Sequence, residues 1–374
     1  MTSDLQVGDE RVVEIGPVAH GGHFIAHSDG RTLFVRHALS GEKARVRITA
    51  VSRKLVRADA VEVLAPSPDR VPAPCPWAHP DGCGGCDLQH VAMPAQRVLK
   101  QQVLTEALTR FGRLSPDQLA DFDLTVRELP GNPDGLHWRT RMTWATDPNG
   151  RHGLRKHHSH DVVAIDRCLI AAEGVDTPGD SPTGKVVHEV RGRSWRLASG
   201  DFWQVHAALP EALVDAVLEF GAPTPGQEWW DLYSGAGLFA AFLGEAVGAD
   251  GQVTAVESVP AAVAVARRAL HDLPQVQLEL ADVSRWLPTA PGRPDGVVLD
   301  PPRAGAGREV LEVVAERAPD VIVYVACDPV ALGRDVATLA DLGYRLDRIR
   351  AFDAFPMTHH LETVALFTQS ASGS

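Results

Sequence analysis

Short runs of alternating apolar and polar residues fill the first 65 positions of the chain, and this alternation is typical of half-buried β-strands. Glycine-containing turns separate the runs. The runs are residues 11–15, 32–35, 44–49 and 58–64. Several short strands within about 60 residues predict a small β-barrel of the OB type.

The middle of the chain has less regular patterning. Residues 66–80 contain six prolines, which predicts a rigid and irregular loop. We expect a helix over residues 94–113, because Pro94 suits its first turn and Gly112 its end. Residues 123–203 are mixed and strand-rich, so this part is predicted as a central α+β region.

Strands and helices alternate in the last part of the chain. Helical periodicity marks residues 260–270 and 308–317. The expected strands are residues 229–233, 253–257, 276–280, 296–300, 321–326 and 363–367. This alternation predicts a doubly wound α/β sheet, which binds ligands at the carboxyl ends of its strands. The chain thus divides into three predicted domains, residues 1–66, 67–203 and 204–374.

The charge of the chain is unevenly distributed. Its 374 residues carry 36 basic and 48 acidic side chains, a net charge of −12 that would argue against a nucleic-acid partner if it were evenly spread. Residues 1–204 hold 25 of each kind, and residues 205–374 hold 11 basic against 23 acidic ones. Basic clusters over residues 43–57 and 139–156 are either solvated faces or a phosphate-contacting surface, and the polarised chain favours the second interpretation.

The sequence offers no sign of a membrane or secretory protein. No apolar run approaches the roughly 20 residues of a membrane span, and the N-terminus lacks the features of a signal peptide. We therefore expect a cytoplasmic monomer with reduced thiols. Five cysteines are an odd number, which disfavours a disulfide framework.

A glycine-rich turn follows the first predicted strand of the α/β part. The run DLYSGAGLF begins at Asp231 and contains Gly235 and Gly237, which would let the backbone approach a ligand closely. Glu257 ends the second strand, 20 residues after Gly237, where an acid can bind ribose hydroxyls. Asp282 follows the third strand, where it could receive an adenine amino group. These residues predict a nucleoside cofactor, either NAD or S-adenosylmethionine.

The fourth strand separates these two cofactors. It ends in Asp300-Pro-Pro-Arg303, where two prolines fix a rigid turn. This turn is unusual in dehydrogenases and resembles motif four of the S-adenosylmethionine-dependent methyltransferases. Motif four of the RNA cytosine-C5 methyltransferases carries a cysteine, and its absence here excludes that family.

Two further residues are candidates for chemistry. Cys327 follows an apolar strand and precedes an Asp-Pro turn, and Glu362 stands at the mouth of the last strand. A buried structural cysteine and a solvated glutamate are the alternatives. The position of Cys327 at the ligand-binding edge favours a nucleophile.

Together, DLYSGAG, VLDPPRAG, YVACDP and THHLETVALF resemble the RNA uridine-C5 methyltransferase family in order and spacing, over most of the chain. The N-terminal barrel resembles a TRAM domain, an RNA-binding module. The resemblance implies a class I methyltransferase domain of Rossmann-like fold, S-adenosylmethionine as cofactor and RNA as partner. Ribosomal RNA is the expected substrate, with transfer RNA or a catalytically inactive RNA-binding relative as alternatives.

The same resemblance assigns roles to individual residues. Cys327 would add to uracil C6 of a flipped uridine, and Glu362 would remove the C5 proton. Gln204 and Tyr233 would lie at the cofactor with Glu257, and Asp300 would lie near both uracil and cofactor. Leu238, His206 and Asp328 stand where the family commonly has asparagine.

The other four cysteines predict a metal site. Cys75, Cys83 and Cys86 are clustered, and Cys168 follows 82 residues later. Clustered thiols in a cytosolic loop indicate metal ligands, and four of them suit zinc or an iron–sulfur cluster. The resemblance favours a [4Fe–4S] cluster over zinc.

Overall fold

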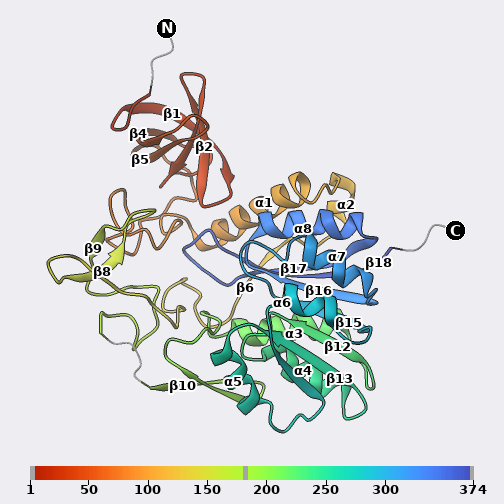
Figure 1. Cartoon of the computed structure of the whole chain (residues 1–374). Helices are drawn as coiled ribbons and strands as arrows, with labels where there is room; N and C mark the ends of the chain where they lie inside the picture. The colour runs from red at the N-terminus through yellow and green to blue at the C-terminus, as the bar shows by residue number, and fades with distance from the viewer. Residues whose placement is uncertain (1–4, 180–183, 371–374) are drawn as a thin grey trace. The chain divides into compact units, whose positions relative to one another are not determined.

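The computed structural model describes residues 5–179 and 184–370 and consists of two compact units that are interleaved along the chain (Figure 1). The first unit comprises Met1–Val103, Asn132–Ser181 and Phe355–His360. The second unit comprises Leu104–Gly131, Pro182–Ala354 and Leu361–Ser374. The division into residues 1–66, 67–203 and 204–374 stays a prediction.

A closed five-stranded barrel begins the first unit, with strands in the order β1-β2-β3-β5-β4. The strands are β1 (Glu10–Ala19), β2 (His23–Ser28), β3 (Arg31–Arg36), β4 (Lys43–Val51) and β5 (Val56–Ala65). Every second side chain points inward, so that Phe24, Leu33, Val46 and Val56 are fully buried. The barrel confirms the prediction from the alternating pattern.

The rest of the first unit has little regular structure. An irregular loop connects the barrel to α1 (Met93–Arg110), which belongs to the first unit up to Val103. A small antiparallel sheet follows later in the chain, formed by β7 (Ala145–Thr146), β8 (His152–Arg155) and β9 (Val162–Ala164).

The second unit is built on an eight-stranded sheet in the order β14-β13-β12-β15-β16-β18-β17-β6. The strands are β6 (Val126–Glu128), β12 (Glu228–Leu232), β13 (Gln252–Glu257), β14 (Val276–Leu280), β15 (Gly296–Leu299), β16 (Val321–Ala326), β17 (Tyr344–Asp353) and β18 (Glu362–Gln369). Strands β12 to β16 pair in parallel, whereas β18 is antiparallel to both of its neighbours.

Helices connect the strands of this sheet, and a separate antiparallel hairpin precedes it. The helices are α2 (Pro116–Ala120), α3 (Leu209–Gly221), α4 (Leu238–Val247), α5 (Pro260–Ala269), α6 (Val283–Trp286), the 3₁₀ turn η1 (Leu287–Thr289), α7 (Arg308–Glu316) and α8 (Pro329–Asp341). The hairpin consists of β10 (Lys185–Val190) and β11 (Arg193–Ala198).

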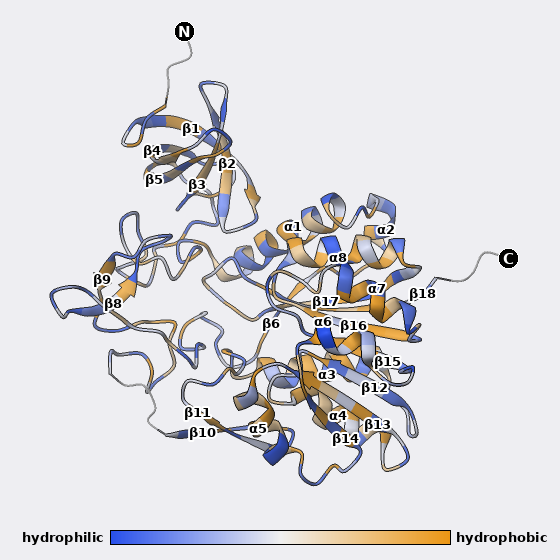
Figure 2. Ribbon diagram, in the orientation of Figure 1, coloured by the Kyte–Doolittle hydropathy of each residue, from blue (hydrophilic) through white to orange (hydrophobic). Residues whose placement is uncertain are grey.

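Burial explains why this sheet could be predicted. Helices cover parallel strands on both faces, so the strands are continuous apolar runs, and Figure 2 shows strands such as β13 in the hydrophobic colour. The segment Ile322–Val325 of β16 is fully buried. The predicted doubly wound α/β domain with an N-terminal barrel is confirmed. Within the described residues, no helix is long and apolar enough to cross a membrane.

Candidate active site

The predicted site residues of the second unit gather at the carboxyl edge of its sheet. Leu232 at the end of β12 pairs with Val256 on β13 and with Leu299 on β15. The next residues along the three strands are Tyr233, Glu257 and Asp300, so they leave the sheet at the same level. The chain reverses its direction of winding between β12 and β15, and ligands of α/β sheets bind at such a point.

Cys327 and Glu362 face each other across the pair β16–β18. Ala326, the last residue of β16, pairs with Thr363, whose hydroxyl donates to the Ala326 carbonyl at 3.0 Å. Cys327 follows Ala326 and Glu362 precedes Thr363, so antiparallel pairing sets the two side by side. Cys327 is half-buried and Glu362 is buried.

The side chains of Cys327, Glu362 and Asp300 interact electrostatically at this edge of the sheet. Burial raises the pKa of the Cys327 thiol to about 12, with further contributions from Glu362 and Asp300. Burial, and then Asp300, raises the pKa of Glu362 well above its usual value. Burial alone raises the pKa of Asp300 to about 7. Arg303 is the neighbouring cation that lowers the pKa of Cys327 and Glu362.

These shifts define the chemistry that the site can perform. A thiol and a carboxyl that are both held neutral lie beside each other, and each gains acidity when a positive charge comes near. The thiol can then become a nucleophile, and the glutamate can accept a proton from a bound molecule. The site therefore suits a cationic ligand and a reaction that combines nucleophilic addition with proton removal.

The glycine-rich loop between β12 and α4 forms the neighbouring part of the edge. Tyr233, Gly235 and Gly237 all have positive φ angles, of 64°, 54° and 81°. A Cβ atom at Gly237 would lie 2.8 Å from a Leu270 methyl group and would have to displace it, and the positive φ of this residue already favours glycine. The Glu257 carboxylate accepts the Gly235 N–H at 2.9 Å and thereby fixes the loop to the end of β13.

Asp231 belongs to this loop region, and sequence reasoning did not assign it a role. Its Oδ2 accepts the Ala240 N–H at 2.8 Å, while its buried Oδ1 has no hydrogen-bond partner among the described residues. Burial raises the pKa of Asp231 to about 8. Its position at the head of the DLYSGAG motif was the available signal.

Two of the predicted cofactor-binding residues, Asp282 and Gln204, lie outside the group formed by Tyr233, Glu257 and Asp300. Asp282 caps the short helix α6 by accepting the Ser284 N–H at 3.0 Å, and this bonding to Ser284 lowers its pKa. Asp282 also contributes, after burial, to the raised pKa of Tyr233, which is about 12. Gln204 is half-buried in the segment between β11 and α3, outside the sheet.

A buried hydrogen-bond network holds the loop that carries Asp300 and Arg303. The Ala306 N–H donates to the Tyr324 hydroxyl at 2.9 Å and to Asp335 Oδ2 at 2.8 Å. A Cβ atom at Gly305 would lie 2.6 Å from the same Asp335 oxygen, so the loop lies directly on this carboxylate. The turn after β15 is thereby fixed to β16 and α8.

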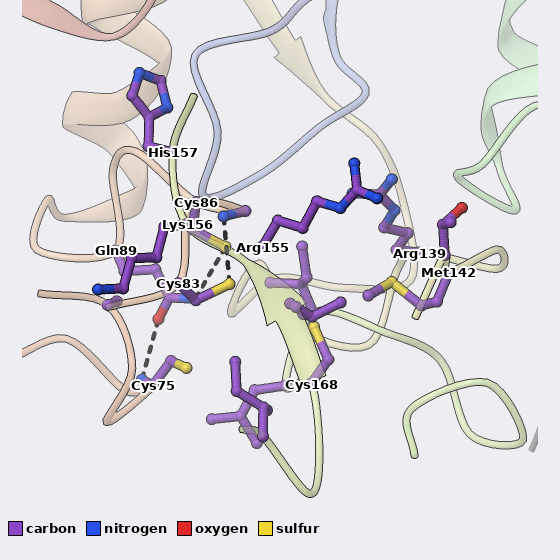
Figure 3. A pocket seen from close by; sticks show the side chains of 18 of the residues that line it. Cys75, Cys83, Cys86, Gln89, Arg139, Met142, Arg155, Lys156, His157 and Cys168 are labelled. Atoms are coloured by element: carbon purple, nitrogen blue, oxygen red, sulfur yellow. Dashed lines mark hydrogen bonds between the residues drawn. The ribbon is translucent and has the colours of Figure 1, made fainter. Parts of the chain in front are cut away.

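The four remaining cysteines line one cavity of about 290 Å³ in the first unit (Figure 3). Cys75, Cys83 and Cys86 come from the loop between the barrel and α1, and Cys168 comes from the segment after β9. Burial raises the pKa of Cys83 to about 11 and that of Cys86 well above its usual value. The structure thus places all four cysteines on one cavity, but among the described residues no group of three such side chains could hold a metal ion, and their role as metal ligands stays a prediction.

Comparison with known proteins adds to this geometry. Residues 293–370, which include Asp300, Cys327 and Glu362, match a family model described as tRNA (Uracil-5-)-methyltransferase, and residues 4–61 match the TRAM domain. A protein of Streptomyces coelicolor described as an uncharacterized RNA methyltransferase is 42% identical over 98% of this chain and 94% of its own length. The 23S rRNA (uracil(1939)-C(5))-methyltransferase RlmD of Alkalilimnicola ehrlichii is 32% identical over 96% of each chain.

This chain belongs to the RNA uracil-C5-methyltransferase family. Its fold agrees with a solved structure, the tRNA (uracil-54, C5)-methyltransferase of Pyrococcus abyssi in complex with S-adenosyl-L-homocysteine. The TM-score is 0.69, and the match covers 95% of this chain and 99% of that one at 20% identity. The barrel of the first unit is the TRAM domain of this methyltransferase.

The structure gives each departure from the family pattern a local role. Asp328 caps helix α8 of the methyltransferase by accepting the Val330 and Ala331 N–H groups at 3.0 and 2.8 Å, where the helix dipole favours its charge. His206 is buried, accepts the Ala208 N–H at 3.2 Å and has a pKa lowered to about 4 by burial. Leu238 is the buried first residue of α4.

Proposed function

We propose that this protein transfers a methyl group from S-adenosylmethionine to C5 of uridine in RNA. The observation that carries the proposal is the proximity of Cys327 and Glu362, which flank the Ala326–Thr363 pair of β16 and β18, with Asp300 in electrostatic contact. A C5 methylation of uracil needs a nucleophile and a base on one site, and these residues supply both.

The residues at the sheet edge fit S-adenosylmethionine. Its sulfonium supplies an electrophilic methyl group and a positive charge. Asp231 offers a buried carboxyl oxygen without a hydrogen-bond partner among the described residues, which suits a polar group of the cofactor. Glu257 stands where ribose hydroxyls bind in this fold, and the predicted contacts of Gln204, Tyr233, Gly235, Gly237 and Asp282 complete this part of the proposal.

The proposed steps use Cys327 first and Glu362 last. The Cys327 thiol first loses its proton to solvent, and the thiolate adds to uracil C6, which makes C5 an enolate carbon. C5 would then take the methyl group, with S-adenosylhomocysteine as the leaving group. Glu362 then takes the C5 proton, the C5–C6 double bond re-forms, and the Cys327–C6 bond breaks. The raised pKa of Glu362 makes it a strong base once it has lost its own proton. Asp300 would lie beside the uracil and the cofactor.

We propose ribosomal RNA as the substrate, because the relative RlmD, 32% identical over 96% of both chains, is named for 23S rRNA. Transfer RNA is the second candidate. In the TRAM domain, Lys43, Arg45 and Arg47 are paired with acidic side chains. Arg53 and Lys54, exposed at the turn between β4 and β5, form no ion pair among the described residues and are therefore free to contact phosphates.

We also propose that Cys75, Cys83, Cys86 and Cys168 hold a [4Fe–4S] cluster, with zinc as the alternative. Four thiolates on one zinc ion lie about 3.8 Å apart, since Zn–S bonds are about 2.3 Å long. Within the described residues, no three side chains are arranged to hold a single metal ion. All four thiols line one cavity of about 290 Å³, and four cations also line it: Arg139, Arg155, Lys156 and Arg167. These charges would offset the negative charge of a thiolate-bound cluster.

The test of the function is to map 5-methyluridine by mass spectrometry in ribosomal and transfer RNA from cells with and without the gene. Loss from ribosomal RNA supports the proposal, and loss from transfer RNA alone contradicts the substrate assignment. The Cys327→Ala variant tests the mechanism: it should bind RNA as the unaltered protein does and leave the uridine unmethylated. If this variant still methylates, Cys327 is not the nucleophile.

A further inference from the structure

The β10–β11 hairpin contacts the glycine-rich loop of the second unit through one buried side chain. Trp195 on β11 is fully buried, and its indole Nε1–H donates to the Ala236 carbonyl at 3.0 Å. Ala236 is itself buried and lies between Gly235 and Gly237, which both have positive φ angles. Because glycine adopts positive and negative φ about equally well, these two residues do not fix the loop conformation by themselves. The loop therefore depends on external hydrogen bonds to hold its conformation.

Besides the Ser234 N–H, which donates to the Val256 carbonyl at 3.0 Å, the loop is held at two further points. Glu257 accepts the Gly235 N–H at 2.9 Å from the side of the sheet. Trp195 donates to the adjacent residue, Ala236, from the side of the hairpin. An acceptor and a donor thus fix the peptide groups on either side of the Gly235–Ala236 peptide, which constrains the direction in which the Ala236 N–H points.

Trp195 also contacts the segment that carries Gln204. Its ring lies 5.4 Å from the ring of Trp203, and Trp203 stacks on His188 of β10 at 5.0 Å. The Trp195 ring also lies 6.2 Å from the ring of Phe242 on α4. One side chain thus joins the segment of Gln204 to the loop of Gly235 and Gly237, although these are more than 30 residues apart in sequence.

The hairpin is itself fixed to the helices that flank the loop. Arg193 on β11 donates to Asp272 at 2.6 Å, to Glu245 at 2.9 Å and to the Ala269 carbonyl at 3.0 Å. Glu245 lies on α4, and Ala269 ends α5. Trp195 is therefore presented to the loop from a rigid support.

We propose that Trp195 is a positioning residue for the methyl donor. It holds the Gly235–Gly237 loop and the Gln204 segment in the arrangement that binds the nucleoside part of the cofactor. The proposal rests on the function proposed above for this site. No residue of the hairpin takes part in the proposed chemical steps.

The test measures binding of S-adenosylhomocysteine to the full-length protein by calorimetry. Trp195→Phe keeps an aromatic ring and removes the N–H donor. We expect its Kd to rise about tenfold, which corresponds to about 1.4 kcal/mol and lies in the range for a buried carbonyl that loses its donor. The KM for S-adenosylmethionine should rise similarly, while kcat and the KM for RNA stay close to those of the unaltered protein.

Trp229→Phe is the matched control. Trp229 is also fully buried, and its indole donates to Gln227 at 3.0 Å at the opposite end of β12. This variant should lose a similar amount of stability and keep its affinity for S-adenosylhomocysteine. Arg193→Gln, which releases the hairpin without changing Trp195, should also weaken binding and decides the question if Trp195→Phe fails to fold.

The proposal is wrong if Trp195→Phe binds S-adenosylhomocysteine as tightly as the unaltered protein, or if Trp229→Phe loses affinity to the same extent. Because binding is measured without RNA, this result is independent of methyl transfer. Weakened binding by Trp195→Phe in a protein that methylates no uridine would support the role of Trp195 and contradict the proposed function.

Discussion

Tyr324 on β16 donates its hydroxyl hydrogen to Asp335 on α8 at 2.5 Å. Tyr324 lies three residues before the proposed nucleophile, Cys327, in the chain. Both oxygens accept the Ala306 N–H, so they join the loop after β15 to the strand that leads to Cys327. These buried hydrogen bonds hold the loop that carries Asp300 and Arg303 against the strand that ends before Cys327.

Removal of the Tyr324 hydroxyl should therefore affect both stability and catalysis. We expect Tyr324→Phe to lower the free energy of unfolding by about 1–3 kcal/mol, because Asp335 and Ala306 lose a buried partner. Displacement of the loop should lower kcat by about tenfold to a hundredfold. Urea unfolding and steady-state kinetics measure the two effects.

Tyr344→Phe is the control for this prediction. The Tyr344 hydroxyl is buried and donates to the Pro319 carbonyl at 2.8 Å, far along the sheet from the carboxyl edge. This variant should lose comparable stability and keep its kcat. Equal losses of kcat in the two variants would show that the Tyr324 network has no specific role.

The buried position of Glu362 leads to a second prediction. Glu362→Gln is neutral and of equal size, so the fold should accept it, since burial already holds Glu362 neutral. Methylation should slow by about 10²–10⁴-fold, the usual contribution of a general base. Because the C5 proton stays in place, Cys327 cannot be eliminated, and a covalent protein–RNA adduct should accumulate on denaturing gels.

The adduct must depend on the cysteine. The double variant Cys327→Ala with Glu362→Gln should give no covalent complex. An adduct that persists without Cys327, or a Glu362→Gln variant that turns over normally, would remove Glu362 from the mechanism.

The raised pKa of Cys327 predicts how the free protein reacts with iodoacetamide. Only the thiolate is alkylated, and a pKa of about 12 means that the thiolate fraction grows about tenfold per pH unit between about pH 7 and pH 10. A positive charge beside the thiol lowers this pKa. Alkylation at constant pH should therefore be faster with S-adenosylmethionine bound than with S-adenosylhomocysteine, whose sulfur is uncharged, in the absence of RNA.

Mass spectrometry of the peptide that contains Cys327 separates its reaction from those of the other four cysteines. A rate that levels off near pH 8 without cofactor contradicts the raised pKa. Equal rates with the two cofactors would contradict the proposed position of the sulfonium.

The cysteine cavity supports a fourth prediction. Gln89 is buried, donates to the Cys86 sulfur at 3.3 Å and accepts the Cys75 N–H at 3.0 Å, so it orients two of the proposed ligands. Gln89→Leu should retain less iron and acid-labile sulfide after anaerobic reconstitution and lose its visible absorption faster in air. Gln275→Leu, which removes a side-chain bond to the Gly244 carbonyl, is the control and should keep its iron content.

The sequence predicted the buried strands of the sheet better than the strands that charged residues interrupt. Strand β16 was found residue by residue, because a strand covered on both faces is an unbroken apolar run. Strand β17, with the sequence YRLDRIRAFD, was missed because charged residues interrupt it and half of its positions are exposed or half-buried. The motifs placed Asp300 and Cys327 at strand ends, since motif and strand are adjacent in the chain.

Contacts that depend on pairing could not be predicted in the same way. Cys327 and Glu362 are 35 residues apart, and they face each other only because β18 runs antiparallel to β16 in one particular register. Trp195 carries no motif, and its contact with Ala236 follows from the docking of a hairpin outside the sheet. The position of the four cysteines around one cavity was predicted from their chemistry. Their spacing in sequence does not give the distances between their sulfur atoms.

The interleaving of the two units limits how this protein can be taken apart or recombined. Phe355–His360 belongs to the first unit, although Ala354 before it and Leu361 after it belong to the second, and Glu362 follows directly. A gene fusion that exchanged the second unit for that of a relative would also have to carry over this six-residue segment or sever it from its packing partners. A functional exchange would therefore have to cut the chain on both sides of Phe355–His360, next to Glu362, rather than at a single boundary.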